Sequence, residues 1–180
     1  MHKDVESILF TEQQIIQRIK ELAAQINEDY KGKNLMLVGL LKGSINFMAD
    51  LMKYIDVDCR IDFICASSYG NSTVSSGRVN IVKDISQPVD NVDILIVEDI
   101  IDSGNTLSFI TKYLGAKNAS SVKICTLLNK PERREIEIPV DYVGFDIPDA
   151  FVIGYGLDYD EYYRNLPYIG ILKPSVYSNT

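Results

Sequence analysis

The stretch Val97-Glu98-Asp99-Ile100-Ile101-Asp102-Ser103-Gly104-Asn105-Thr106 decides how this chain folds and what it can bind. It completes the apolar run Ile94-Leu95-Ile96-Val97, which is typical of a buried strand because it is rich in β-branched residues and uninterrupted. Two adjacent acids come next, then a third acid and a small polar turn, and a helix is predicted over 107–115. The stretch therefore predicts a strand, a polar turn and a helix, in that order.

The side chains of this turn are those that bind a phosphorylated sugar. Gly104 lets the backbone approach a ligand closely, and the free N–H groups at the start of a helix favour an anion. Ser103 and Thr106 add hydroxyl donors. Glu98 and Asp99 would repel a phosphate, so we expect them to face a vicinal diol or to hold Mg²⁺. A phosphate beside a diol describes a ribose 5-phosphate. The alternative is an ordinary strand, turn and helix with surface acids.

Length and composition indicate one globular domain over residues 1–180. With 46% hydrophobic and 24% charged residues, the chain is long enough for a single full-sized core. No apolar run approaches the ~18 residues of a membrane helix, and residues 1–6 are too acidic for a signal peptide. We therefore expect a cytoplasmic protein that has no membrane partner.

The single histidine and the net charge narrow the chemistry further. We expect the histidine, His2, to lie at a frayed terminus away from any site. This excludes Ser-His-Asp triads, Cys-His pairs and histidine-ligated metals, and leaves proton transfer to carboxylate, Lys, Tyr or Cys. Oxygen ligands for a metal favour Mg²⁺. The net charge of −7 argues against a nucleic acid as partner.

Predicted strands and helices alternate through the middle of the chain. Helices are predicted over 15–26, 45–55 and 107–115, and strands over 8–10, 35–40, 57–66, 79–82, 94–97, 122–128, 142–145, 151–153 and 169–172. Such alternation predicts an α/β fold whose mostly parallel central sheet is flanked by helices. Ligands of such sheets bind beyond the carboxyl ends of the strands, so Lys42, the Glu98 to Thr106 segment and Lys130 should converge.

The opening stretch resembles the phosphoribosyl-pyrophosphate-binding motif of the type I phosphoribosyltransferases. Further segments, in order from about Leu35 to Lys173, are similar to the hypoxanthine-guanine phosphoribosyltransferases, and the ending Asn165-Leu166-Pro167-Tyr168-Ile169-Gly170 resembles their bacterial branch. The other matching segments are Leu41-Lys42-Gly43, Ser67-Ser68-Tyr69-Gly70, Asn129-Lys130-Pro131, Asp146-Ile147-Pro148-Asp149, Phe151-Val152-Ile153-Gly154-Tyr155 and Leu157-Asp158-Tyr159-Asp160-Glu161-Tyr162-Tyr163-Arg164-Asn165-Leu166.

The resemblance implies both a fold and a reaction. The fold would be the type I phosphoribosyltransferase fold, in which a mostly parallel sheet flanked by helices carries a small hood from the N- and C-terminal segments and a flexible lid loop. The reaction would be a glycosyl transfer of purine salvage. It moves 5-phosphoribosyl from phosphoribosyl pyrophosphate to N9 of hypoxanthine or guanine, a 6-oxopurine base, and yields IMP or GMP plus pyrophosphate. The resemblance also implies a Mg²⁺ cofactor and a homodimer or homotetramer.

The resemblance assigns a role to each matching residue. The phosphoribosyl and 5′-phosphate site comprises Glu98, Asp99, Asp102, Ser103, Gly104, Asn105 and Thr106, and Asp102 is the general base for the purine proton. The pyrophosphate site comprises Lys42, Gly43 and Arg164, where the family uses main-chain N–H groups and often a non-proline cis peptide bond. The purine site comprises Lys130, Phe151, Val152 and Asp158, the metal ligands are Glu98, Asp99 and Asp158, and the lid contains Ser68 and Tyr69.

General chemistry supports these roles to different degrees. A donor from Lys130 to the purine O6 would select against adenine, because two donors would then oppose each other. The fixed fork of Arg164 suits a pyrophosphate. Taken alone, Phe151 is more typical of a core side chain than of a stacking platform, and the alternative for Lys42 is an exposed turn lysine. The assignments of these two residues therefore rest on the resemblance.

Two other functions stay open at this point. The first is a regulator that senses phosphoribosyl pyrophosphate and binds RNA on the same fold. Lys130, Phe151-Val152 and Asp158 favour the enzyme, and the acidic net charge disfavours RNA. The second is a transferase for adenine, xanthine or orotate, which the C-terminal match opposes.

Overall fold

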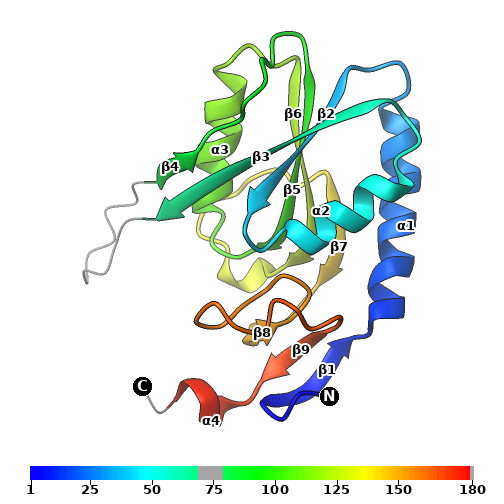
Figure 1. Cartoon of the computed structure of the whole chain (residues 1–180). Helices are drawn as coiled ribbons and strands as arrows, with labels where there is room; N and C mark the ends of the chain where they lie inside the picture. The colour runs from blue at the N-terminus through cyan, green and yellow to red at the C-terminus, as the bar shows by residue number, and fades with distance from the viewer. Residues whose placement is uncertain (69–78, 179–180) are drawn as a thin grey trace.

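The computed structural model describes residues 1–68 and 79–178, and in that part the chain forms two sheets (Figure 1). The larger sheet has the strand order β4-β3-β2-β5-β6-β7, and the smaller has the order β1-β9-β8. The strands are β1 Val5–Phe10, β2 Leu35–Leu41, β3 Cys59–Ser68, β4 Val79–Lys83, β5 Asp93–Ile101, β6 Ser121–Asn129, β7 Tyr142–Asp146, β8 Val152–Ile153 and β9 Ile169–Leu172. The helices are α1 Glu12–Asp29, α2 Ile45–Leu51, α3 Asn105–Gly115 and α4 Pro174–Tyr177, with 3₁₀ segments at Met52–Tyr54 and Pro131–Arg133.

Parallel pairing dominates the larger sheet. Strands β3, β2, β5, β6 and β7 pair in parallel, and only β4, at the edge, runs antiparallel to its neighbour β3. The helices α2 and α3 fall between successive parallel strands, as such crossovers require. The predicted α/β fold with a mostly parallel central sheet is confirmed.

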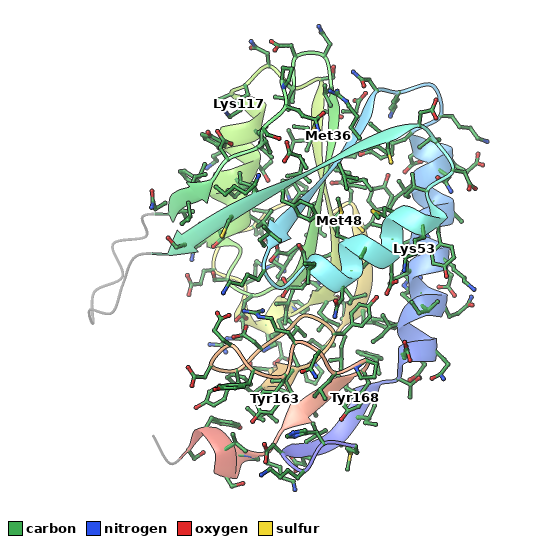
Figure 2. All side chains as sticks on the ribbon, in the orientation of Figure 1. Met36, Met48, Lys53, Lys117, Tyr163 and Tyr168 are labelled. Carbon is green, nitrogen blue, oxygen red and sulfur yellow. The ribbon has the colours of Figure 1, made fainter. Side chains whose placement is uncertain are left out.

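Both faces of this sheet are buried, which explains the uninterrupted apolar runs of β2 and β5. Alternate residues point to opposite faces. Leu35, Leu37, Leu95 and Val97 pack in one core with residues of α1 and α2, whereas Met36, Val38, Ile94 and Ile96 pack in another with residues of α3. Figure 2 marks one methionine of each core, Met48 on α2 and Met36 on β2. The helices therefore cover both faces and leave the strand ends accessible.

Helix α1 shows how local sequence sets an element boundary. Its N-cap is Thr11, whose hydroxyl accepts from the Gln14 backbone N–H at 3.3 Å. The Gln14 side chain in turn accepts from the Thr11 backbone N–H at 2.9 Å, which completes a capping box. The buried residues recur at helical spacing, as Ile15, Ile19, Leu22, Ala23 and Ile26.

The smaller sheet is the predicted hood, built from N- and C-terminal segments. Strand β9 pairs antiparallel with both β1 and β8 at the bottom of Figure 1. The expectation of a frayed His2 is wrong. Its backbone N–H donates to the Tyr168 hydroxyl at 2.8 Å, and its ring meets Tyr163 edge-on, with ring centroids 5.4 Å apart. Figure 2 labels both tyrosines. These contacts keep His2 in the hood.

Several element boundaries differ from the predictions. Strand β5 continues past Val97 to Ile101 because β6 supplies partners as far as the Ile101–Asn129 pair, whereas its pairing with β2 stops at Val97. The predicted 45–55 helix ends at Leu51, and α3 begins at Asn105 rather than at residue 107. The short helix α4 was not predicted. No helix in the described part of the chain is long and apolar enough to cross a membrane.

The carboxylate of Asp62 fastens β3 to the loop that leads into β5. It is 6% exposed and accepts from the backbone N–H groups of Phe63 at 2.7 Å and Ser86 at 2.7 Å, from the Ser86 hydroxyl at 3.0 Å and from the Gln87 backbone at 3.2 Å. Burial raises the pKa of this carboxyl, but the hydrogen bonds outweigh burial and lower the pKa below its ordinary value.

Replacing the carboxylate as Asp62→Asn should destabilise the fold by about 2 kcal/mol, because its charge-assisted hydrogen bonds weaken. Urea denaturation at neutral pH measures the loss, and Asp58→Asn, at an exposed position nearby, is the control. The pKa of Asp62 is lowered, so its contribution is complete above the unfolded-state pKa and disappears as pH falls through the folded-state pKa. A stability difference that is constant down to acid pH would contradict this assignment.

Candidate active site

The carboxyl ends of β2, β5 and β6 meet at one edge of the sheet, where these strands are neighbours. The turn after β2 lies against β5, because a Cβ built on Gly43 would overlap the Asp99 carboxylate. The segment after β6 lies against β5 on the other side, where the Lys130 backbone N–H donates to the Ile101 carbonyl at 3.0 Å. The predicted convergence of these three segments is confirmed.

The turn between β5 and α3 has the form of an anion site. Gly104 is the N-cap of α3 and has a φ of 86°, a conformation that favours glycine. The Ser103 hydroxyl accepts from the Asn105 backbone N–H at 3.3 Å and from its side chain at 3.1 Å. A cavity of about 150 Å³ lies here, lined by Glu98, Ile100, Ile101, Asp102, Ser103, Gly104, Thr106 and Leu107. The size and the helix N-terminus suit a phosphate group.

The acids Glu98 and Asp99 lie on β5 beyond the end of its pairing with β2. Burial raises the pKa of Glu98 well above its ordinary value, and the neighbouring Asp99 charge raises it further. Burial also raises the pKa of Asp99, although a hydrogen bond from Glu98 and the charge of Arg164 oppose this. The Glu98 Oε2 atom is buried and has no hydrogen-bond partner among the described residues. Glu98 Oε2 therefore lacks a donor, which a cation or a sugar hydroxyl would supply.

The turn after β2 carries Lys42 and Gly43, two of the three residues predicted to bind pyrophosphate. The Leu41–Lys42 peptide bond is cis. Gly156 packs directly on this turn, because a Cβ built on it would overlap the Gly43 carbonyl oxygen. Lys42 Nζ lies 2.8 Å from a carboxylate oxygen of Glu161. Two segments far apart in the sequence thus meet without any side chain between their backbones.

Arg164, the third residue predicted to bind pyrophosphate, lies beside this turn. Its Nη1 donates to the Gly156 carbonyl at 2.7 Å. Its Nη2 lies 2.9 Å from Asp158 and 3.4 Å from Glu161. Glu161 therefore holds Lys42 and Arg164, the two cations predicted for pyrophosphate, on one carboxylate. Asp158, predicted for the purine and metal sites, contacts Arg164 on this side and also accepts from the Glu161 backbone N–H at 2.9 Å.

The residues predicted for the purine lie between the larger sheet and the hood. The Lys130 side chain is 7% exposed, and its Nζ lies 3.7 Å from Asp149. Phe151 is 40% exposed, and its ring stacks on Tyr177 at 5.2 Å and meets the edge of Tyr159 at 5.4 Å. Val152 is buried in β8. Phe151 is thus a half-exposed aromatic platform rather than a core side chain.

Asp102, the predicted general base, follows β5 directly. Its side chain is 49% exposed, and its nearest charged partner is Arg133, whose Nε lies 3.5 Å from Asp102 Oδ1. Arg133 also contacts Asp149 at 3.4 Å, the carboxylate that faces Lys130. Asp102 is therefore an accessible carboxylate in the turn of residues 102–106, named the phosphate loop after the group predicted to bind there, and it lies beside the segment that carries Lys130.

The structure adds four residues that sequence reasoning did not assign to the site. Glu161 contacts Lys42, and Arg133 contacts Asp102. Asp149 contacts Lys130, and Tyr177 contacts Phe151. Glu161 and Asp149 fall inside the segments that carry the family resemblance, which was the available signal. The predicted lid residue Ser68 is the last residue of β3, and Tyr69 lies outside the described residues.

The three predicted metal ligands, Glu98, Asp99 and Asp158, do not form a complete metal site by themselves. Among residues 1–68 and 79–178, no group of three or more His, Cys, Asp or Glu side chains is placed to hold a metal ion. Mg²⁺ in enzymes is usually held by one or two carboxylates, water and substrate phosphates. The partly buried pair Glu98 and Asp99, in which Glu98 Oε2 has no hydrogen-bond partner among the described residues, fits that arrangement.

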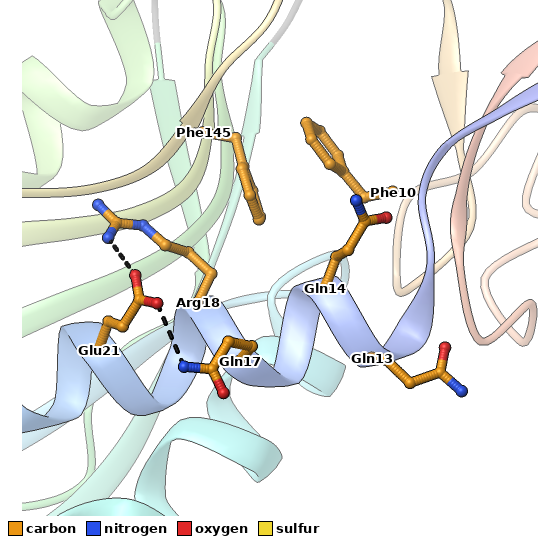
Figure 3. A pocket seen from close by; sticks show the side chains of 7 residues that line it. All are labelled: Phe10, Gln13, Gln14, Gln17, Arg18, Glu21 and Phe145. Atoms are coloured by element: carbon orange, nitrogen blue, oxygen red, sulfur yellow. Dashed lines mark hydrogen bonds and ion pairs between the residues drawn. The ribbon is translucent and has the colours of Figure 1, made fainter.

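A larger hollow elsewhere lacks the chemistry of a phosphate site. It has a volume of about 380 Å³ and is lined by Phe10, Gln13, Gln14, Gln17, Arg18, Glu21 and Phe145 (Figure 3). Its base is the stacked pair of Phe10 and Phe145, whose ring centroids are 4.0 Å apart. The one cation there, Arg18, is paired with Glu21 at 2.7 Å. It contains no predicted site residue.

Comparison with known proteins agrees with this geometry. The phosphoribosyl transferase domain model matches residues 6–160. The chain belongs to the phosphoribosyl transferase family. This phosphoribosyl transferase is 53% identical over 179 residues to the hypoxanthine-guanine phosphoribosyltransferase of Bacillus subtilis (strain 168), with 99% of each chain covered. It is 54% identical to the protein of that name from Staphylococcus aureus (strain COL), with 99% of this chain and 100% of the relative covered.

A solved structure supports the same assignment. The crystal structure of a hypoxanthine phosphoribosyltransferase from Staphylococcus aureus superimposes with a TM-score of 0.96 and 54% identity, covering 99% of this chain and 97% of that one. The type I phosphoribosyltransferase fold predicted from the sequence is therefore confirmed.

In this phosphoribosyl transferase, Gly104→Ala should lower the free energy of unfolding by about 1–3 kcal/mol, because an L-residue is strained at positive φ. The added Cβ would also lie 2.9 Å from the Ile136 carbonyl oxygen. The matched control is Gly115→Ala in the same helix, whose Cβ would meet nothing within 4 Å. Urea denaturation compares them, and equal stability of the two variants would mean that the turn tolerates a side chain.

Proposed function

We propose that the protein is a purine salvage enzyme that transfers 5-phosphoribosyl from phosphoribosyl pyrophosphate to N9 of hypoxanthine and guanine. The products are IMP and GMP, with pyrophosphate. The observation that carries this proposal is the phosphate loop at Gly104 flanked on one side by the buried acids of β5 and on the other by Lys130. The names of relatives at 53–54% identity over nearly the whole chain support the same reaction.

The phosphoribosyl group would occupy the cavity at the start of α3. The backbone and hydroxyl groups of Ser103, Gly104, Asn105 and Thr106 would hold its 5′-phosphate. Glu98 and Asp99 would bind the ribose hydroxyls, directly or through the metal. Lys42, Gly43 and Arg164 would hold the pyrophosphate on the opposite side of the sugar.

The purine would enter between the larger sheet and the hood. Phe151 offers a half-exposed ring on which the base can stack, and the backbone of Val152 would recognise its edge. Lys130 would donate to O6. Since the Lys130 side chain is buried, an opposed donor such as the amino group of adenine would be left unsatisfied, which favours 6-oxopurines.

In the reaction, the bond from C1′ to the pyrophosphate oxygen breaks and the bond from C1′ to N9 forms. The proton released from the purine ring passes to Asp102, whose half-exposed carboxylate is accessible to it. Lys42 and Arg164 stabilise the negative charge that develops on the leaving pyrophosphate. Ser68 and Tyr69, in the proposed lid, would exclude water that could compete for the sugar.

We include Mg²⁺ as the cofactor. Glu98, Asp99 and Asp158 would hold it together with oxygens of the substrate. When bound, the ion supplies positive charge to the pyrophosphate leaving group. The adjacent acids support this assignment, because Glu98 Oε2 is buried and has no hydrogen-bond partner among the described residues.

The regulator on the same fold is the weaker candidate. Its RNA ligand would need a basic surface, and the chain carries a net charge of −7. The relatives reported above carry the names of enzymes. We further propose a cytoplasmic location and an assembly that is a homodimer or a homotetramer, which sedimentation velocity would distinguish.

The direct test is formation of IMP from hypoxanthine, phosphoribosyl pyrophosphate and Mg²⁺. Guanine, xanthine and adenine are assayed in parallel, and EDTA replaces the metal in a control. Metal-dependent IMP and GMP without AMP is the expected result. Binding of phosphoribosyl pyrophosphate with no product from any base would overturn the enzyme and favour the regulator.

Asp102→Asn should lower kcat by about 100-fold or more, because the amide cannot accept the purine proton. Its stability should stay near that of the wild type, since the side chain is half exposed. Steady-state kinetics and thermal unfolding measure the two effects. Asp90→Asn, at an exposed position before β5, is the control. Near-normal turnover of the Asp102 variant would assign the general base to another group.

A further inference from the structure

The segment after β6, residues 131–138, passes over the phosphate loop as a strap. The backbone N–H groups of Glu135 and Ile136 both donate to the Ser103 carbonyl, at 3.0 and 3.1 Å. The Asn105 side chain donates to the Glu135 carboxylate at 2.7 Å. The strap is therefore joined to the loop on both sides of Gly104.

One side chain of the strap, Arg134, lies beside Gly104 itself. The Arg134 Cδ atom would be 3.2 Å from a Cβ built on Gly104. Its Nε is bonded to Cδ and so lies close to the same turn. This Nε atom is buried and has no hydrogen-bond partner among the residues that the structure describes. A buried donor of a guanidinium group without an acceptor costs stability, so a purely structural arginine would satisfy it.

The other end of the guanidinium reaches the purine segment. Arg134 Nη2 donates to the side-chain oxygen of Asn129. The Asn129 side-chain amide donates in turn to Asp146 at 2.7 Å, and the Asn129 backbone carbonyl accepts from the Ile147 backbone N–H at 2.9 Å. Asn129 directly precedes Lys130, the residue proposed to select the base. The Arg134 side chain thus lies between the phosphate loop and Asn129, the residue that precedes Lys130.

We propose that Arg134 is a positioning residue that fixes the placement of Lys130 relative to the phosphate loop. Its positive charge also favours a dianionic 5′-phosphate in that loop. This inference rests on the proposed function, because it concerns the relative placement of the two substrates. Arginine suits the task, since its planar fork can bond Asn129 and still present Nε to the loop. A lysine at position 134 would keep the positive charge, but its single ammonium group could not bond Asn129 and face the phosphate loop at the same time.

The variants Arg134→Ala and Arg134→Lys test this role, with Arg60→Ala as control. Arg60 contacts Asn34 at 3.4 Å at the opposite end of the sheet. Arg134→Ala should raise KM for phosphoribosyl pyrophosphate and for hypoxanthine by about tenfold each, while kcat changes much less, because Arg134 holds groups that bind the two substrates and does not touch the reacting atoms. Arg134→Lys should recover part of the KM for phosphoribosyl pyrophosphate but not that for hypoxanthine.

Chemical rescue separates positioning from a general loss of structure. Millimolar guanidinium ion should lower both KM values of Arg134→Ala toward those of the wild type, and should leave Arg60→Ala and the wild type unchanged. KM values of Arg134→Ala equal to those of the wild type, or a rise that guanidinium does not reverse, would overturn the proposal. If Arg134→Ala does not fold, Arg134→Lys decides it, and wild-type KM values for both substrates would overturn it. An inactive wild-type enzyme would instead refute the proposed function.

Discussion

The close packing on both sides of Gly43 is the constraint on which the site depends. A side chain on Gly43 would overlap the Asp99 carboxylate, and a side chain on Gly156 would overlap the Gly43 carbonyl. The turn after β2 is therefore packed between the Asp99 side chain of β5 and the backbone of the segment that leads to Arg164. This packing brings Arg164 near enough to Asp99 to influence its pKa. Any residue larger than glycine at either position would push the two proposed phosphate-binding halves apart.

Charge pairing is the second organising feature of this edge. Four of the cations here each have a carboxylate partner. Lys42 pairs with Glu161, and Lys130 pairs with Asp149. Arg133 pairs with Asp102, and Arg164 pairs with Asp158. In contrast, neither Glu98 nor Asp99 forms an ion pair among the described residues, and burial raises the pKa of both, although the Arg164 charge opposes the rise at Asp99. The site thus has ion pairs around two acids that are not ion-paired. Partly buried pairs of this kind specify geometry more than they add stability.

Much of the fold and part of the site could be predicted from the sequence, because both are encoded locally. Apolar periodicity located the parallel strands, and the turn at Gly104 located the phosphate loop. The carboxyl ends of β2, β5 and β6 had to converge once the sheet was parallel. The length of β5 was underestimated, because its last residues are polar and are held by pairing with β6 rather than by apolar character. Pairings such as that of Lys42 with Glu161 join segments more than a hundred residues apart, and local patterns carry no information about them.

The hood has a consequence for how the molecule is completed during synthesis. Strand β1 has no partner in the larger sheet and pairs with β9, so it stays unpaired until residues 169–172 have left the ribosome. The six strands of the larger sheet all lie before residue 147, so they can assemble earlier. Strand β8, which follows Phe151 directly, is also paired only by β9. The proposed phosphate end of the site can therefore form before the proposed purine end, and a nascent chain would acquire a place for the sugar before it acquires one for the base.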